Sequence, residues 1–519
     1  MGKDQEFGEL LMVGFDGVRI KDELRRYILR WKVGGVILFG RNILGSDQVA
    51  ELCENLKGLR REVADTPLLI AIDQEGGTVA RLREGVTAFP GNLALGCAGS
   101  SDDAYYQGMV IGRELREHGI NMNLAPVLDL YSDRGSKSLG LRALGRDPKK
   151  VSEMGAALIR GMQEEGVIAT AKHFPGKGSA RVDSHEELPV IKETLEELKR
   201  RDIIPFQYAI AAGVKAIMTS HAAYPVLEEG AVIPGTISRN LMTVLLRDEL
   251  KFCGILISDD LGMGALRGGY SPATTAIESL RAGVDILLLC HDPVAREEVL
   301  ASLSTTRDKD REIRERMEES LARLAAVKSG LNFQEAVQSL TPDLDGNKLS
   351  LRIARRGISI YRSSGKQIPI DSESRIFMVR FQPEMTVEVE GSTITADDPA
   401  EHLKVLGFKP EVFNLPLLPG AEEVEYLSNR LPGIIPVIIA CYDAHRYPGQ
   451  KKLIDDLLTR RPDAILAIMR DPRDAELFPR ASTIIITRGY TAPSLQALAE
   501  VLAGKILNRG DAEIAERKD

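Results

Sequence analysis

The first 290 residues repeat one pattern eight times: a short apolar run followed by an amphipathic stretch. The runs lie between residues 9 and 290 and read ELLMVGF, VGGVILFG, LLIAID, MNLAPVLDL, GVIATAKHF, KAIMTSH, GILISDD and VDILLLC. Runs that are short and apolar throughout are typical of parallel strands buried on both faces. Apolar residues recur at helical spacing in the stretches 46–63, 147–166, 238–250 and 271–283, each of which opens on Ser or Asp. Eight such units in about 300 residues predict a (β/α)8 barrel, with a doubly wound open sheet as the alternative.

A second α/β series follows near residue 350. Its predicted strands are 375–381, 434–442, 464–470 and 483–488, and its predicted helices are 421–431, 449–461 and 494–506. A charged helical region fills 293–340, and Pro, Asp and Gly cluster just after it, as in a linker. We therefore expect a barrel domain over 1–340 and an open-sheet domain over 341–519. No strand is followed by a GxGxxG loop, so a dinucleotide-binding role has no support.

The net charge of -8 argues against a nucleic-acid partner, because phosphate contacts require a basic face. No window approaches the roughly 20 apolar residues of a membrane span, and no long apolar segment follows the first basic residues, so we predict a cytoplasmic protein without membrane contact. All five cysteines except Cys97 lie in apolar segments, and we expect them to be reduced core residues. No residue set resembles a structural zinc site, and we predict no cofactor.

Charged and imidazole side chains stand at the ends of four predicted strands. They are Asp73, Lys172 with His173, His221, and Asp259 with Asp260. A single Asp after a strand is more often a turn or helix-cap residue. Four occupied strand ends favour a functional site, because the carboxyl ends of barrel strands meet at one mouth.

The loop KHFPGKGSARVDSHEELP, residues 172–189, carries the richest chemistry of the chain. Asp183 lies two residues from His185, and a carboxylate beside an imidazole suits general acid/base work near neutral pH. Asp259, placed rigidly at a strand end, could act as a nucleophile or stabilise charge. With Asp73, Lys172 and His173 able to bind hydroxyls, the set suits attack at a sugar acetal carbon.

At these residues the sequence resembles glycoside hydrolase family 3, in its β-N-acetylhexosaminidase branch. The resemblance rests on IDQEGGTVARL (72–82), the 172–189 loop and LISDDLGMGAL (256–266). NLAPVLDL (123–130), LRALGRDP (141–148) and IMTSHAAYPVLE (217–228) support it. LSLRIARRGISIYRS and ITRGYTAPSLQALAEVLAGKI are similar to the opening and closing segments of the family's second domain. The resemblance implies a (β/α)8 barrel followed by an αβα-sandwich domain.

The resemblance also implies residue roles. Asp259 would be the nucleophile, His185 the acid/base and Asp183 its partner. The first sugar subsite would be formed by Asp73, Arg142, Lys172 and His173. Asp260 and Met263 would shape the site, and His221 would support it or only pack beneath the mouth.

Two positions depart from the family pattern. Lys177 stands where His is more common, and its charge could depress the pKa of His185 or bind an anionic group; the alternative is a solvated loop lysine. Leu141 stands where an acidic residue is common, which removes a possible partner of Arg142 and weakens its assignment to sugar binding.

The leading functional hypothesis is a retaining exo-β-N-acetylglucosaminidase that acts on small, cell-wall-derived oligosaccharides, such as GlcNAc linked to (anhydro)muramic acid. A β-N-acetylglucosaminide phosphorylase and a β-glucosidase of the same family are alternatives. Two other classes are a metal-dependent barrel hydrolase built on His173, His185 and His221, and a non-catalytic sugar sensor. The predicted partner is a small carbohydrate, and the sequence leaves the oligomeric state, the acceptor and a role for the second domain in the site open.

Overall fold

A computed structural model of the 519-residue chain describes residues 7–132, 139–180, 182–184, 186–267, 269–331, 344–365, 367–382 and 397–506.

Eight parallel strands form the sheet of the first domain. Their spatial order is β10 (Leu287–Leu289), β1 (Leu11–Val13), β2 (Gly35–Leu38), β3 (Leu69–Ile72), β6 (Met122–Asn123), β7 (Ile168–Phe174), β8 (Ala216–Thr219) and β9 (Ile255–Ile257). A parallel bridge between Ile257 and Ile286 joins the two ends of this sheet. Every residue of these strands is buried, as the uniformly apolar runs predict. The barrel prediction is confirmed, and the open-sheet alternative is wrong for this domain.

Helices surround the barrel sheet. The longer ones are α1 (Asp22–Trp31), α2 (Ser46–Arg61), α4 (Ser101–Glu117), α5 (Pro148–Glu164), α7 (Ile204–Ala211), the π-helix η7 (Asn240–Glu249), α9 (Pro272–Ala282), α10 (Pro293–Lys309) and α11 (Arg311–Ser329). The shorter ones are α3 (Asn92–Ala98), α6 (Leu195–Arg200) and α8 (Gly264–Arg267). The four predicted helical stretches become α2, α5, η7 and α9. Two of them begin as predicted, because the side chains of Asp147 and Ser271 accept hydrogen bonds from the first free N–H groups of α5 and α9.

The second sheet has six strands in the order β11 (Ser359–Ser363), β16 (Thr483–Ile486), β15 (Ile465–Ile468), β14 (Val437–Cys441), β12 (Arg375–Gln382) and β13 (Lys409–Pro416). β11 is antiparallel to β16, and the other neighbours are parallel. The helices of this region are α12 (Gly346–Gly357), α13 (Pro399–Val405), α14 (Ala421–Arg430), α15 (Pro448–Arg460) and α16 (Ala492–Leu502). The four predicted strands form, whereas the edge strands β11 and β13 were not predicted.

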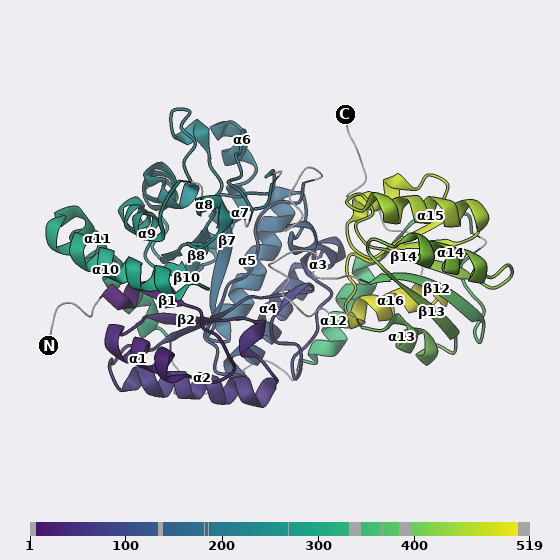
Figure 1. Cartoon of the computed structure of the whole chain (residues 1–519), viewed down its shortest axis with the longest axis horizontal. Helices are drawn as coiled ribbons and strands as arrows, with labels where there is room; N and C mark the ends of the chain where they lie inside the picture. Colours follow the sequence, from purple (N-terminus) through teal and green to yellow (C-terminus); the bar gives the residue numbers. More distant parts are fainter. Residues whose placement is uncertain are drawn as a thin grey trace.

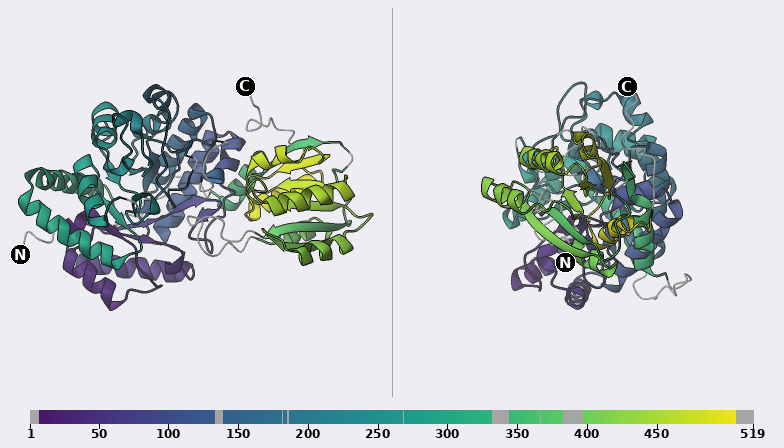
Figure 2. Two further views of the ribbon diagram at one scale, coloured as in Figure 1. Left: turned by 45° about the horizontal axis from the view of Figure 1, so that its top comes forward. Right: turned by 90° about the vertical axis from the view of Figure 1, so that its right-hand side faces the viewer.

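The two sheets lie side by side with α12 and α3 between them (Figures 1 and 2). Arg352 and Arg356 of α12 form ion pairs with the buried Asp103 of α4, at 2.7 and 2.8 Å. α12 therefore fastens the second domain to the outside of the barrel. The predicted domain boundary at residue 340 falls in 332–343, outside the described residues.

Within the described residues, no helix is both long and apolar enough to cross a membrane. Cys53, Cys290 and Cys441 are buried and carry free thiols, as predicted. The prediction is wrong for Cys253, which is exposed because it lies in the turn that precedes β9 rather than in the sheet.

Candidate active site

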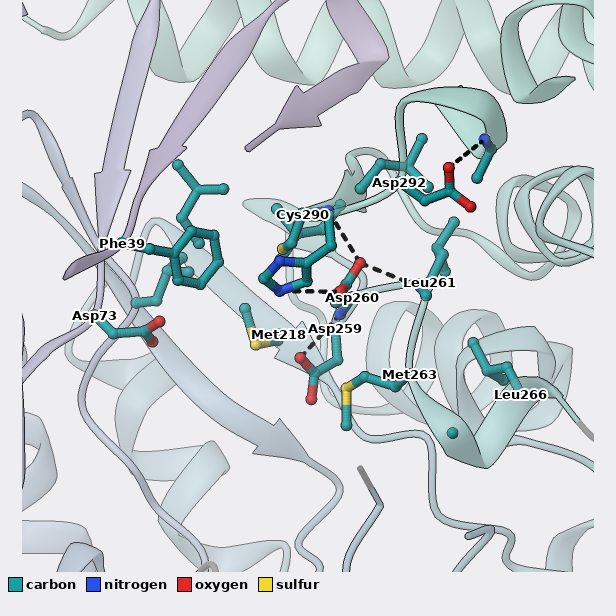
Figure 3. Close-up of a pocket in the computed structure, with 18 of the residues that line it drawn as sticks. Phe39, Asp73, Met218, Asp259, Asp260, Leu261, Met263, Leu266, Cys290 and Asp292 are labelled. Carbon is teal, nitrogen blue, oxygen red and sulfur yellow. Dashed lines mark hydrogen bonds and ion pairs between the residues drawn. The ribbon is translucent and has the colours of Figure 1, made fainter. Parts of the chain in front are cut away.

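A cavity of about 710 Å³ opens at the carboxyl ends of the barrel strands. Seven side chains singled out in the sequence line it: Asp73, Arg142, Lys172, His173, Asp259, Asp260 and Met263. Figure 3 shows the carboxylates of Asp73 and Asp259 on opposite sides of the same space. Apolar side chains, including Phe39, Met218 and Leu266, form much of the remaining wall. The fold thus brings together polar residues from strand ends that are far apart in the chain.

A buried carboxylate that the sequence analysis missed organises the polar wall. Glu75 accepts two hydrogen bonds from Arg142, at 2.8 and 2.9 Å, and lies 2.7 Å from Lys172 Nζ. Lys172 also donates to Asp73 Oδ1 at 2.8 Å. Burial alone would raise the pKa of Glu75, but the charges of Arg142 and Lys172 outweigh burial and lower it from 4.5 to about 2. Glu75 is therefore the acidic partner of Arg142, a role that Leu141 cannot fill.

A second missed carboxylate orients His173. Asp129 is fully buried, and its Oδ2 lies 2.6 Å from Nδ1 of His173. Its Oδ1 accepts the backbone N–H of Lys177 at 2.8 Å. Burial, together with the charge of Lys177, holds the pKa of His173 well below its usual range. The neutral ring donates Nδ1–H to Asp129, which leaves Nε2 as an acceptor for a sugar hydroxyl.

Lys177 is buried, with 7% of its surface exposed, so it is not a solvated loop lysine. Its Nζ lies 3.4 Å from Ser184 Oγ. Burial lowers the pKa of Lys177, while the charges of Asp259 and Asp129 oppose that effect. A cation is therefore enclosed near the predicted nucleophile.

The predicted acid/base pair belongs to the loop after β7. Asp183 and Ser184 are buried, and the carbonyl of Ser184 accepts the backbone N–H of Ala265 in α8 at 3.1 Å. This contact holds the loop against the turn that follows Asp259. His185 lies outside the described residues.

A ring of hydrogen bonds fixes the turn that carries Asp259. The backbone N–H of Asp259 donates to Thr219 Oγ1 at 3.3 Å, and Thr219 Oγ1 lies 2.8 Å from Thr236 Oγ1. Thr236 Oγ1 lies 2.6 Å from His221 Nδ1, and His221 Nε2 lies 3.0 Å from the carbonyl oxygen of Asp260. That carbonyl can only accept, so Nε2 carries the proton and Nδ1 accepts from Thr236. Burial lowers the pKa of His221, which suits this neutral form.

His221 is fully buried and does not line the cavity, so it supports the turn that carries Asp259 from beneath. Asp260 is held by backbone donors, because its Oδ1 accepts from Gly262 at 3.2 Å and from Cys290 at 3.1 Å. Met263 stands on the cavity wall beside Asp259 (Figure 3). These residues shape the space around Asp259, the predicted nucleophile.

Of the three histidines in the metal-dependent alternative, His221 is withdrawn by its own hydrogen bonds. Both ring nitrogens of His221 have partners, whereas His173 uses Nδ1 for Asp129 and keeps Nε2. Two groups of described side chains have ligand atoms close enough for one ion, and neither includes His173 or His221.

Comparison with known proteins identifies relatives of this chain. Residues 3–327 match the family model of the glycosyl hydrolase family 3 N-terminal domain. A beta-hexosaminidase from Thiobacillus denitrificans is 39% identical over 302 residues, which cover 56% of this chain and 81% of that protein. Beta-hexosaminidase A from Pseudoalteromonas piscicida is 33% identical over 371 residues, 66% of this chain and 62% of that protein, so the match spans less than two thirds of its length.

The structure of a glycoside hydrolase family 3 beta-N-acetylglucosaminidase from a Paenibacillus species superposes with a TM-score of 0.92. Its sequence is 35% identical, and the match covers 98% of both chains. The likeness therefore includes the second sheet as well as the barrel.

Proposed function

Because this chain belongs to glycoside hydrolase family 3, we propose that it is a retaining exo-β-N-acetylglucosaminidase. Its substrates would be small oligosaccharides derived from the cell wall that carry a terminal β-linked GlcNAc. The similar Paenibacillus structure, which is a beta-N-acetylglucosaminidase, supports this choice of sugar. The observation that carries the proposal is the placement of Asp259 opposite the Asp73 and Lys172 pair in one cavity (Figure 3).

In the first step, the Asp259 carboxylate attacks the anomeric carbon while the bond to the leaving oxygen breaks. His185, oriented by Asp183, gives its proton to that oxygen. In the second step, His185 takes a proton from water, the water oxygen bonds to the anomeric carbon, and the bond to Asp259 breaks. Two displacements at one carbon retain its configuration.

The contacts of the other cavity carboxylates favour an imidazole, rather than one of these carboxyl groups, as the acid/base. Asp73 is paired with Lys172, and Asp260 accepts two backbone N–H groups. Asp292 accepts from the first N–H groups of α10, at 2.8 and 3.3 Å. Each of these three groups has a structural task, so the Asp183–His185 loop is the better source of the transferable proton.

The hydroxyl-binding wall would hold the sugar ring. Lys172 and Arg142 are cationic donors fixed by Glu75, and Nε2 of His173 is an acceptor. Fixed donors and acceptors lose little freedom when a sugar binds, which favours orientation of the anomeric carbon toward Asp259.

The buried charge of Lys177 near Asp259 favours a second candidate, a phosphorylase. In that reaction phosphate, rather than water, would attack the glycosyl-enzyme. A cation in this place could offset the charge of the incoming anion.

The test is nitrophenol release from the β-GlcNAc and β-glucoside substrates, each with and without phosphate. We expect turnover of the GlcNAc substrate without stimulation by phosphate. Phosphate stimulation with GlcNAc-1-phosphate as product would make the protein a phosphorylase, and preference for the glucoside would make it a β-glucosidase. Absence of turnover with both substrates would contradict all three assignments.

The Asp259→Asn variant should lose activity by about a thousandfold or more, because the nucleophile is removed. Asp292→Asn is the matched control at the same cavity. Asn is as good a helix cap as Asp, so this variant should change kcat/KM by less than about tenfold. Equal losses in the two variants would refute the role of Asp259.

A further inference from the structure

The second sheet has a point at which open α/β sheets commonly bind ligands. The chain runs from β12 outward to β13 and then returns to β14 on the other side of β12. Open α/β sheets commonly bind ligands beside such a reversal, which here lies outside the carboxyl ends of β12 and β14.

Four arginines gather at these carboxyl ends. Arg380 is near the end of β12 and hydrogen-bonds to Tyr442; Arg446 follows β14; Arg470 and Arg473 follow β15. Arg470 lies 3.4 Å from Asp443, and Arg473 lies 2.6 Å from Asp471. Asp443 and Asp471 are thus the carboxylate partners of Arg470 and Arg473.

Arg446 differs from its neighbours. Its guanidinium is half-buried and makes no hydrogen bond or ion pair within the described part of the chain. Burial lowers the pKa of Arg446, and the charges of Arg473 and Arg470 lower it further. The charges of Asp443 and Asp471 oppose this shift. An anion at this place would relieve both effects.

The same cluster is poorly suited to a metal ion. Asp443, His445 and Asp471 could reach one ion by distance. However, His445 Nδ1 lies 2.7 Å from Asp474 Oδ1, and Arg473 donates to His445 Nε2 at 3.2 Å. The imidazole and both carboxylates are already engaged, and the surplus charge is positive.

The carboxyl ends of the strands in the second sheet face the mouth side of the barrel. Tyr131 donates its hydroxyl to Asp471 Oδ1 at 2.6 Å, and Thr491, after β16, donates to the carbonyl of Phe89 at 3.2 Å. Tyr131 follows β6 in the chain and precedes Arg142, and the side chain of Arg142 lines the sugar cavity. The ring of Tyr131 also carries the guanidinium of Arg146, 4.9 Å from its centroid.

We propose that Arg446, with Arg470 and Arg473 beside it, forms an oxyanion site that binds a carboxylate on the aglycone of the substrate. The inference rests on the proposed function, because it takes the aglycone to leave the cavity over the Tyr131 segment. A guanidinium matches a carboxylate in geometry and charge. The second domain thereby selects acidic aglycones, while the barrel holds the terminal sugar.

The experiment compares two matched β-GlcNAc disaccharides, one with a carboxylate on its second sugar and the other with the methyl ester. We expect the wild type to prefer the acid by about tenfold in kcat/KM, and Arg446→Gln to remove this preference without changing turnover of the ester. The control is Arg480→Gln, which removes one exposed positive charge at the opposite edge of the sheet, before β16, and should leave both substrates unaffected.

Equal turnover of acid and ester by the wild type would overturn the proposal, and so would an equal loss with both substrates in Arg446→Gln. Added phosphate tests whether the site binds a free anion instead. That result would be a wild type with no preference for the acid, in which phosphate alters turnover of the ester, and an Arg446→Gln variant in which phosphate has no effect. If neither disaccharide is cleaved, the proposed function fails. Calorimetric titration of the wild type and Arg446→Gln with the free acidic sugar then decides the site separately, and absence of binding would overturn it.

Discussion

Replacement of Glu75 by glutamine tests whether charge holds together the wall that would bind the sugar. Glu75 is enclosed between Arg142 and Lys172, with its nearest contacts at 2.7 to 2.9 Å. The amide keeps the shape of the side chain but removes its charge. The buried cations of Arg142 and Lys172 then remain. Among the described residues, Asp73 is the one carboxylate that still contacts Lys172.

The magnitude follows from the pKa of Glu75. Its value falls from 4.5 to about 2 on folding, a difference worth about 3 kcal/mol at roughly 1.4 kcal/mol per pH unit. Breaking a buried ion pair by removing one partner costs a similar amount, about 3–5 kcal/mol. Because the folded-state pKa is depressed, this stability is fully present above pH 4.5 and is lost as the pH falls toward 2.

The assay is urea unfolding followed by the fluorescence of Trp31. This is the only tryptophan of the chain and it lies in α1, so the signal reports the barrel. We expect Glu75→Gln to lower the free energy of unfolding by about 3 kcal/mol at pH 7 and by about 1 kcal/mol at pH 3. Glu84→Gln, at an exposed position nine residues further along the chain, should stay within about 0.5 kcal/mol of the wild type at both pH values.

A loss below about 1 kcal/mol at pH 7 would refute the coupling of Glu75 to the two cations. A loss that is the same at pH 7 and pH 3 would show that shape, not charge, is responsible.

Three further perturbations test the surroundings of Asp259, the proposed nucleophile. Thr236→Val removes the hydroxyl that links Thr219 to His221, and it should lower kcat by about tenfold with little change in KM. The control is Thr170→Val, which removes a buried hydroxyl that has no hydrogen-bond partner among the described residues and should leave kcat unchanged. Lys177→Met removes a buried cation near the nucleophile and should move the acid limb of the kcat/KM profile upward by about one pH unit; an unchanged profile would contradict this role. Gly178→Ala would place Cβ 2.0 Å from the carbonyl oxygen of Leu130, so it should destabilise the barrel by more than about 2 kcal/mol in the same fluorescence assay, and wild-type stability would refute that packing.

The sequence by itself determined the barrel, because strands that are buried on both faces are visible in the sequence as apolar runs. The same feature placed Asp73, Lys172, His173 and Asp259 at strand ends, which parallel topology brings together. The edge strands β11 and β13 escaped prediction because they are only partly buried and lack such runs; β13 even contains two prolines.

Only the tertiary structure decided which charges are paired. Glu75 and Arg142 are 67 residues apart, and Tyr131 and Asp471 are 340 apart. A spacing along the chain predicts contacts within one helix or strand, but it does not reveal which side chains from separate strands meet. For the same reason, only the fold revealed the burial of Lys177 and the position of His221 beneath the turn that carries Asp259, since both depend on neighbours that other strands supply.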